Sequence, residues 1–322
     1  MWFKILLINC FQYDSFSSEG HDVCKIISLL FVREKVNYSV CIFFCRFHKS
    51  KCFPLFIKFY VERNEHFATK LLLFHRDFPE YVMIVTYIFH SGYVIETERF
   101  SIVFDFYKDA KKSDGTYFVR DYLLKKPEDL YVFCSHSHPD HFNPEILSWK
   151  EKKNNITYIF ANELLESKQT IGTGVHYLAK YAKFEDYNLW AQLFGSTDLG
   201  GSFLVNVNDK LIFHAGDLNN WHWKEEVSKE EALVFENNYL CELELLAENV
   251  NHLYLAMFPI DPRLGKEYMR GAEQFVSRIP TEYLLPMHFG EQYAKVNAFE
   301  NIARQNNCNY LKVTHTGQSF EL

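Results

Sequence analysis

The run HSHPDH at residues 136–141 holds the densest group of side chains able to do chemistry in this chain of 322 residues. Residues at positions i and i+2 of an extended segment point to the same side, so His136 and His138 can bind one cation together. The proline that follows ends this segment, and Asp140 and His141 then turn toward a second ion. Imidazole nitrogen and carboxylate oxygen bind zinc at about 2.0–2.2 Å. Because burying such polar groups without partners is costly, the run predicts a site for one or two divalent ions, with zinc as first choice.

Strands and helices must bring this run to the edge of a folded core. Apolar runs bounded by turn residues predict strands at Met83–His90, Tyr93–Glu98, Ser101–Asp105, Leu130–Ser135, Thr157–Phe160, Phe203–Val207, Lys210–His214, His252–Met257 and Tyr283–Met287. Helical segments are predicted at Pro144–Lys152, with Asn143 as N-cap, and at Glu225–Glu248 and Gly271–Ile279. Strands that first form a meander and then alternate with helices predict an α/β sandwich with its sheets covered by helices.

Composition changes near Met83 and suggests two parts. Residues 1–82 carry 11 Lys and Arg against 8 Asp and Glu, whereas the remainder carries 23 against 33. We therefore predict an N-terminal extension of uncertain structure over residues 1–82 and one domain over residues 83–322 that carries the run at 136–141. Met83 could then serve as a translation start of its own. The alternative is an N-terminal subdomain that packs on the core.

Charge, hydropathy and cysteine usage exclude some classes of protein. A net charge of -7 gives no reason to expect nucleic-acid binding, which depends on clustered Lys and Arg. No apolar run approaches the roughly 20 residues that cross a bilayer, so we expect no membrane association. Three of the eight cysteines are widely spaced beyond residue 83, as in a reducing compartment, and no clear signal peptide is present, so we predict a cytoplasmic protein.

Three of the five earlier cysteines could form a small zinc knot with a nearby histidine. The candidate ligands are Cys41, Cys45, His48 and Cys52. Their spacing is irregular for such a knot, so scattered core thiols are the favoured interpretation.

The run HSHPDH resembles the HxHxDH signature of the metallo-β-lactamase superfamily, and the resemblance extends over residues 83–322. It implies a four-layer αββα sandwich with the metal site at one edge of the sheets. Asp105 matches an early acidic residue that orients the HxHxDH loop without binding metal. Asp217, in FHAGD, matches the carboxylate that bridges two ions, and His288, in PMHF, matches the last histidine of the second site. The phrases SHSHPDHF, AGDLNNWHW and PMHF are most similar to the uncharacterised bacterial hydrolase branch near the ascorbate-6-phosphate lactonases.

One departure from that pattern concerns the first metal site. The superfamily usually supplies a third histidine just before the next strand, but the matching stretch GSTDLGGS at residues 195–202 has none. Asp198 could replace it as an oxygen ligand. Otherwise the first site has only His136, His138 and Asp217. An oxygen-richer site would shift selectivity from zinc toward manganese or iron.

Four further residues have two possible roles each. His90 lies either at the edge of the site or in the core as a structural histidine. His214 either supports the ligands or, as we favour, is a satisfied core histidine. His222 either lines the substrate entrance or packs in its loop beside two tryptophans. Arg263 could bind an anionic substrate group with its planar guanidinium, although a structural salt bridge is the commoner fate of such a residue.

The resemblance implies a hydrolase in which a metal-activated hydroxide attacks an ester, lactone, amide or phosphoester bond of a small molecule. Asp140 would bind metal and orient the nucleophile, and Asp140 or His222 would pass a proton to the leaving group. No cofactor besides the metal is expected. The alternative is a metal-binding protein that does not hydrolyse, either di-iron oxidoreductase-like or catalytically inactive. The missing histidine favours this alternative, whereas the lack of an attached flavin domain counts against the di-iron version. Substrate and oligomeric state stay open.

Overall fold

The chain divides into two units, Met1–Glu80 and Tyr81–Leu322. In the first unit, the computed structural model describes the backbone of strands β1 (Val23–Glu34), β2 (Asn37–His48) and β3 (Lys51–Val61). In the second unit it describes residues 82–168 and 174–322. The division lies close to the predicted seam at Met83, and independent folding of residues 83–322 stays a prediction.

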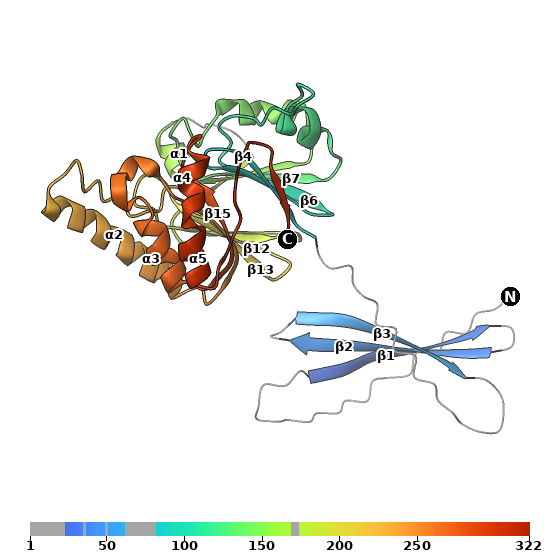
Figure 1. Cartoon of the computed structure of the whole chain (residues 1–322). Coiled ribbons are helices and arrows are strands. Elements are labelled where there is room, and N and C mark those ends of the chain that lie inside the picture. The colour runs from blue at the N-terminus through green and yellow to red at the C-terminus, as the bar shows by residue number, and fades with distance from the viewer. Residues whose placement is uncertain (1–22, 35–36, 49–50, 62–81, 169–173) are drawn as a thin grey trace. The chain divides into compact units, whose positions relative to one another are not determined.

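The three strands of the first unit form an antiparallel sheet in the order β1-β2-β3 (Figure 1). Two of the cysteines proposed for a zinc knot share strand β2, and the third lies on β3. Their side chains lie outside the described residues, so the two interpretations of these cysteines stay as predictions.

Two seven-stranded mixed sheets form the centre of the second unit (Figure 1). The first sheet has the order β17 (Ser319–Glu321), β4 (Ile84–Phe89), β5 (Gly92–Glu96), β6 (Phe100–Phe104), β7 (Asp129–Cys134), β8 (Ile156–Ala161), β9 (Val175–Leu178). The second has the order β10 (Lys183–Glu185), β11 (Trp190–Phe194), β12 (Ser202–Val207), β13 (Lys210–His214), β14 (Leu253–Pro259), β15 (Thr281–Met287), β16 (Asn309–Tyr310).

Aromatic side chains join the two sheets face to face. Phe133 on β7 meets Phe203 on β12 with ring centroids 5.0 Å apart. The hydroxyl of Tyr93 on β5 donates to the carbonyl of Pro286 on β15 at 2.6 Å. Strands β5 and β6 are buried along their whole length, as expected for strands covered on both faces.

Helices cover the outer face of each sheet. On the second sheet lie α2 (Lys229–Ala247), α3 (Arg270–Arg278), α4 (Tyr293–Val296), η5 (Asn297–Phe299) and α5 (Glu300–Gln305), with η4 (Pro262–Glu267) leading into α3. Phe275 of α3 stacks on Phe258 of β14 at 4.5 Å, and α2, α3 and α5 form one layer in Figure 1. On the first sheet lie η1 (Phe118–Tyr122), η2 (Leu123–Lys125), η3 (Pro144–Glu151) and α1 (Glu163–Glu166). The unit therefore has the predicted αββα layers.

Local signals in the sequence explain several element boundaries. The side chain of Asn143 accepts a hydrogen bond from the amide of Glu145 and caps η3, although this segment is a 3₁₀ helix. Ser228 and Glu231 form a capping box, so α2 begins four residues later than the predicted Glu225. A tight turn at residues 208–209 joins β12 to β13.

The topology places many chemically active residues at one edge. Strands β6, β7 and β8 are parallel, as are β13, β14 and β15. Their carboxyl ends are followed within three residues by Asp105, by the run at 136–141, and by Asp217, Asp261 and His288. Carboxyl ends of parallel strands meet at the same edge of a sheet, so these side chains converge.

Candidate metal centre

The loop after β7 is held in place by one buried carboxylate. Asp105 accepts hydrogen bonds from the amide of Ser135 at 2.7 Å and from its hydroxyl at 2.6 Å. The other side of the loop is closed by the amide of His141, which donates to the carbonyl of His138 at 3.0 Å. Asp105 is fully buried and adopts a left-handed backbone with φ of 41°. It supports the run without lying among the candidate ligands, as the resemblance implies.

Asp217 lies at the centre of the cluster. Its Oδ2 is 3.4 Å from Nε2 of His136, and its Oδ1 is 3.2 Å from Nε2 of His141. The same Oδ1 is 3.5 Å from Nε2 of His288. One carboxylate thus faces three imidazoles from two different sheets, as expected for a residue shared between two ions.

The residues of the cluster form three overlapping groups, within each of which the candidate ligand atoms lie within 4.8 Å of one another. These groups are His136, His141 and Asp217; His138, Asp198 and Asp217; and His90, Asp140, His141 and His288. All seven metal ligands predicted from the sequence are therefore brought together. His90 is an addition that was not among them.

Two buried atoms indicate that this donor set suits a cation. Nε2 of His141 and Oδ1 of Asp217 have no hydrogen-bond partner among the described residues. Buried polar atoms are nearly always paired, and a cation between them would satisfy both. Imidazoles and carboxylates in this mixture are ligands for zinc, manganese or iron.

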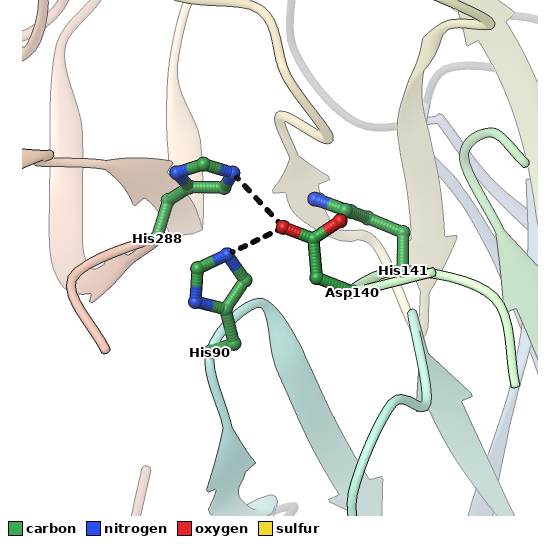
Figure 2. A group of neighbouring side chains, drawn as sticks. All are labelled: His90, Asp140, His141 and His288. Carbon is green, nitrogen blue, oxygen red and sulfur yellow. Dashed lines mark ion pairs between the residues drawn. The ribbon is translucent and has the colours of Figure 1, made fainter. Parts of the chain in front are cut away.

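Figure 2 shows the group made by His90, Asp140, His141 and His288. Oδ2 of Asp140 lies 3.3 Å from Nε2 of His90 and 3.9 Å from Nε2 of His288. The rings of His90 and His288 approach to 4.2 Å between centroids. We name these four residues the histidine-rich group.

On the other side of Asp217, the ligands are more exposed. Nε2 of His136 lies 3.1 Å from Nδ1 of His138, which is 3.8 Å from Oδ2 of Asp198. The side chains of His138 and Asp198 are 41% and 44% exposed. We name His136, His138 and Asp198 the rim group. Asp198 occupies the place expected for a substitute of the missing histidine.

Two glycines permit the close approach of the loops that carry the rim group. A Cβ on Gly200 would lie 1.9 Å from the carbonyl oxygen of Ser135, and Gly200 has φ of 65°. A Cβ added to Gly216 would lie 2.9 Å from the Cβ of Ser135, and Gly216 also has a positive φ. Only glycine fits both the space and the backbone conformation, so these positions place Asp198 and Asp217 against the loop after β7.

Carboxylates outside the ligand set orient two of the histidines. Nδ1 of His141 donates to Oδ2 of Asp105 at 2.7 Å. Nδ1 of His288 donates to Oδ2 of Asp261 at 2.9 Å, and Arg263 forms a salt bridge to the same oxygen at 2.6 Å. Such partners fix the ring so that Nε2 faces the metal. Asp261 was not predicted from the sequence, although its position after a strand was the available signal.

The charges of the cluster depend on one another. Burial opposes ionisation of Asp217, but His141 and His288 outweigh it and hold the pKa of this carboxyl well below its usual range. Burial opposes a charged His141 as well, yet Asp217 and Asp105 raise its pKa well above the usual value. The neighbouring imidazole of His90 lowers the pKa of Asp140 against the effect of burial. The acids are thus ready to bind a cation at neutral pH.

His214 and His222 lie outside the candidate ligand groups. His214 is fully buried, its Nε2 is 2.9 Å from the carbonyl of Ser91, and its ring stacks on Phe104. His222 is 1% exposed, its Nε2 is 3.2 Å from the carbonyl of Glu267, and its Nδ1 accepts from the amide of Lys224. Because both nitrogens of His222 are engaged by backbone, this arrangement argues against its predicted catalytic role.

A pocket of about 390 Å³ opens over the cluster. Its walls include ligands from both groups, the aromatic residues Trp221, Trp223 and Phe235, and Arg263. The two indole rings are nearly parallel, with centroids 6.2 Å apart. Arg263 thus makes the salt bridge that was the favoured interpretation and also borders the pocket.

Comparison with known proteins identifies the architecture. The chain is similar to a metallo-hydrolase, Igni18 from the archaeon Ignicoccus hospitalis, with 16% identity, a TM-score of 0.54, and coverage of 75% of this chain and 98% of that one. It is also similar to the metallo-β-lactamase fold protein YhfI of Bacillus subtilis, with 12% identity, a TM-score of 0.51, and coverage of 76% and 100%. The chain has the metallo-β-lactamase fold. The fold predicted from the sequence is thereby confirmed.

A relative found by sequence carries the comparison further. The UPF0173 metal-dependent hydrolase YtkL of Bacillus subtilis (strain 168) is 26% identical in an alignment over 232 residues. The match covers 64% of this chain and 86% of that protein. No family model matches the chain. The named relative and the fold neighbours support the predicted metal-dependent hydrolase and specify neither the bond cleaved nor the substrate.

Proposed function

We propose that this metallo-β-lactamase-fold protein is a metal-dependent hydrolase that cleaves an ester, lactone, amide or phosphoester bond of a small molecule. The position of Asp217 carries the proposal, because its two oxygens face the rim group on one side and the histidine-rich group on the other. A structural metal site would be closed by protein ligands. This one lies beneath an open pocket.

A divalent ion bound here would lower the pKa of a water molecule toward neutrality and stabilise the charge that develops on the substrate oxygen. The chain's own residues would hold the ions and orient the reacting groups. His136, His138 and Asp198 would bind one ion, Asp140, His141 and His288 the other, and Asp217 both. Asp140 has a partly exposed carboxylate in the pocket wall and is the residue best placed to orient the attacking water.

The pocket favours a substrate of modest size with an apolar part and an anionic part. Its volume lies at the small end of the range for small-molecule sites. Trp221, Trp223 and Phe235 offer flat apolar surface. Arg263 is anchored by Asp261 while its side chain stays 58% exposed, so part of the guanidinium is left to bind a carboxylate or phosphate.

Zinc remains the first choice of metal, with manganese or iron as alternatives at the oxygen-richer rim group. We keep the cytoplasm as the proposed location, since a reducing compartment would preserve the free thiols of Cys134, Cys241 and Cys308. Among the described residues, no helix has the length and apolar character needed to span a bilayer.

The test combines metal analysis with a panel of esters, lactones, phosphodiesters and β-lactams. We expect metal to co-purify or to reconstitute, and at least one class of substrate to be cleaved. His138→Ala and Asp217→Ala should each lose metal and hydrolysis. His252→Ala is the matched control, because His252 is an exposed histidine at the start of β14, away from the carboxyl ends of the strands. Full activity in Asp217→Ala would refute the proposal.

The non-hydrolytic alternative gains no particular support. The chain resembles the di-iron β-hydroxylase CmlA of Streptomyces venezuelae at 12% identity and a TM-score of 0.52. The match covers 74% of this chain but only 54% of CmlA. This likeness shows the shared fold alone. The convergence of the seven predicted ligands also argues against a catalytically inactive descendant, even though one histidine of the superfamily pattern is absent.

A further inference from the structure

His90 lies in the tight turn between β4 and β5, and its backbone is fixed from two sides. Its amide donates to the hydroxyl of Tyr87 at 2.9 Å. Its carbonyl accepts from the amide of His288 at 3.2 Å. The residue has φ of 59°, in the left-handed region that asparagine, aspartate and histidine adopt more often than other residues with a Cβ. The turn therefore holds the Cα of His90 in a fixed place beside the site.

The ring of His90 points into the cluster (Figure 2). It packs on His288 at 4.2 Å and meets His141 edge-on at 5.9 Å between centroids. Its Nε2 is buried and has no hydrogen bond of acceptable geometry among the described residues. That nitrogen lies 3.3 Å from Oδ2 of Asp140, itself a predicted ligand. A buried nitrogen that makes no well-aligned hydrogen bond, and that lies beside the carboxylate of a candidate ligand, is in the position of a metal ligand.

We propose that His90 is a further ligand of the ion held by Asp140, His141 and His288. The proposal rests on the proposed function only in that a metal must bind this cluster. Ligands about 2.1 Å from one ion lie no more than about 4.2 Å apart. The distances from Asp140 to His90 and to His288, 3.3 and 3.9 Å, satisfy that limit.

The extra ligand would make the two metal sites unequal. The histidine-rich group would offer three imidazoles and a carboxylate, whereas the rim group offers two imidazoles and the carboxylate of Asp198. Asp217 is shared by both. Zinc favours imidazole over additional carboxylates. The ion in the histidine-rich group is therefore the one retained when metal is scarce, and the rim group fills second.

The variant His90→Asn tests this in the full chain, because asparagine tolerates the left-handed conformation and keeps the turn. Metal-free protein is titrated with zinc against a chelating dye. We expect two binding steps in the unaltered protein and at least about 10-fold weakening of the tighter step in the variant, which is the smallest loss typical of disturbing even the partners of a ligand. His252→Asn should change neither step.

A spectroscopic count of ligands separates direct binding from mere orientation of Asp140. X-ray absorption of protein loaded with one equivalent of zinc should show three imidazoles, and two in His90→Asn. Circular dichroism confirms the fold of the variant, and His90→Gly serves if asparagine disturbs the turn. An unchanged imidazole count and an unchanged tighter step would overturn the proposal while leaving the hydrolase intact. Failure of the unaltered protein to bind any zinc would overturn both.

Discussion

The histidine-rich group and the rim group share Asp217 but differ in how the protein holds them. His141 and His288 are 0% and 4% exposed, and each donates its Nδ1 hydrogen to a buried carboxylate. His138 and Asp198, by contrast, are more than two-fifths exposed. Support from a second layer of residues restricts a ligand to the orientation that binds metal. The buried, carboxylate-supported His141 and His288 are therefore built to retain an ion, whereas the exposed His138 and Asp198 allow exchange of ions, water and substrate.

This difference follows from the backbone beneath each group. In the histidine-rich group, His90 and His288 directly follow β4 and β15. Asp198 of the rim group comes from the connection between β11 and β12, where its amide bonds to the side chain of Ser196 at 3.3 Å. Strand ends therefore fix His90 and His288, whereas Asp198 depends on glycines that let one loop lie on another.

Removing the charge of Asp105 should have the largest effect, because that carboxylate supports His141 and the loop carrying both groups. Asp105→Asn leaves His141 without its buried charged partner, and breaking such a buried pair costs about 3–5 kcal/mol of unfolding free energy. We also expect zinc affinity to fall by about 10–100-fold. Thermal unfolding and zinc titration measure the two quantities. Asp114→Asn, an exposed carboxylate in a turn, is the control. If the stability and the zinc affinity of Asp105→Asn both equal those of the unaltered protein within error, Asp105 does not have this supporting role.

The substitution Gly200→Ala should separate the two groups. Its Cβ would meet the carbonyl of Ser135 at 1.9 Å, in a backbone conformation that costs about 1–3 kcal/mol for other residues. We expect Tm to fall and the weaker zinc step to be lost, while the tighter step survives. Gly115→Ala is the matched control, since Gly115 also has positive φ but no atom within 4 Å of an added Cβ. Equal losses in both variants would show that strain alone, and not the contact with Ser135, explains the effect.

Asp198 should have a smaller effect, confined to the rim group. Asp198→Ala removes one oxygen ligand from an exposed site, so the weaker zinc step should weaken by about 10-fold with little change in Tm. Asp198→His should instead strengthen this step for zinc and reduce the preference for manganese. Competition titrations with the two metals measure both. Identical metal preference in the two variants would show that residue 198 does not bind the ion.

The sequence allowed prediction of features that depend on short stretches of neighbouring residues. The run at 136–141 places four ligands within six residues, and the resemblance identified Asp217 and His288. Central strands such as β7 and β13 were predicted because long apolar runs mark buried strands. Short edge strands were not. β10 is only Lys183–Glu185, with alternately exposed and half-buried residues, and carries no apolar pattern.

The positions of His90 and Asp261 could not be predicted with confidence for a related reason. The position of His90 depends on how the two sheets face each other, and that of Asp261 depends on which strands are neighbours in one sheet. Sequence patterns encode neither arrangement. Asp261 follows β14 and meets His288 after β15 only because these strands are parallel neighbours. The loop that carries His222 turns its ring toward the backbone of η4, and the predicted catalytic role of this residue stays a prediction.

The smallest effect is expected at Arg263, which touches the pocket but only indirectly the metal. The hydrogen bonds that Arg263 donates to Asp261 raise its already high pKa, so the guanidinium stays charged. Arg263→Lys keeps a positive charge but loses the planar fork that can bind Asp261 and a substrate anion together. For a carboxylate-bearing ester, KM should rise by about 10-fold with kcat nearly unchanged, because one charge-assisted hydrogen bond contributes about 1.5–3 kcal/mol. A neutral ester of the same alcohol should be cleaved as before. Arg270→Lys is the control, since Arg270 pairs with Glu236 and does not line the pocket. A fall in kcat for both esters would instead place Arg263 among the supports of His288, through Asp261, and would extend the buried, carboxylate-supported side of the site to the pocket wall.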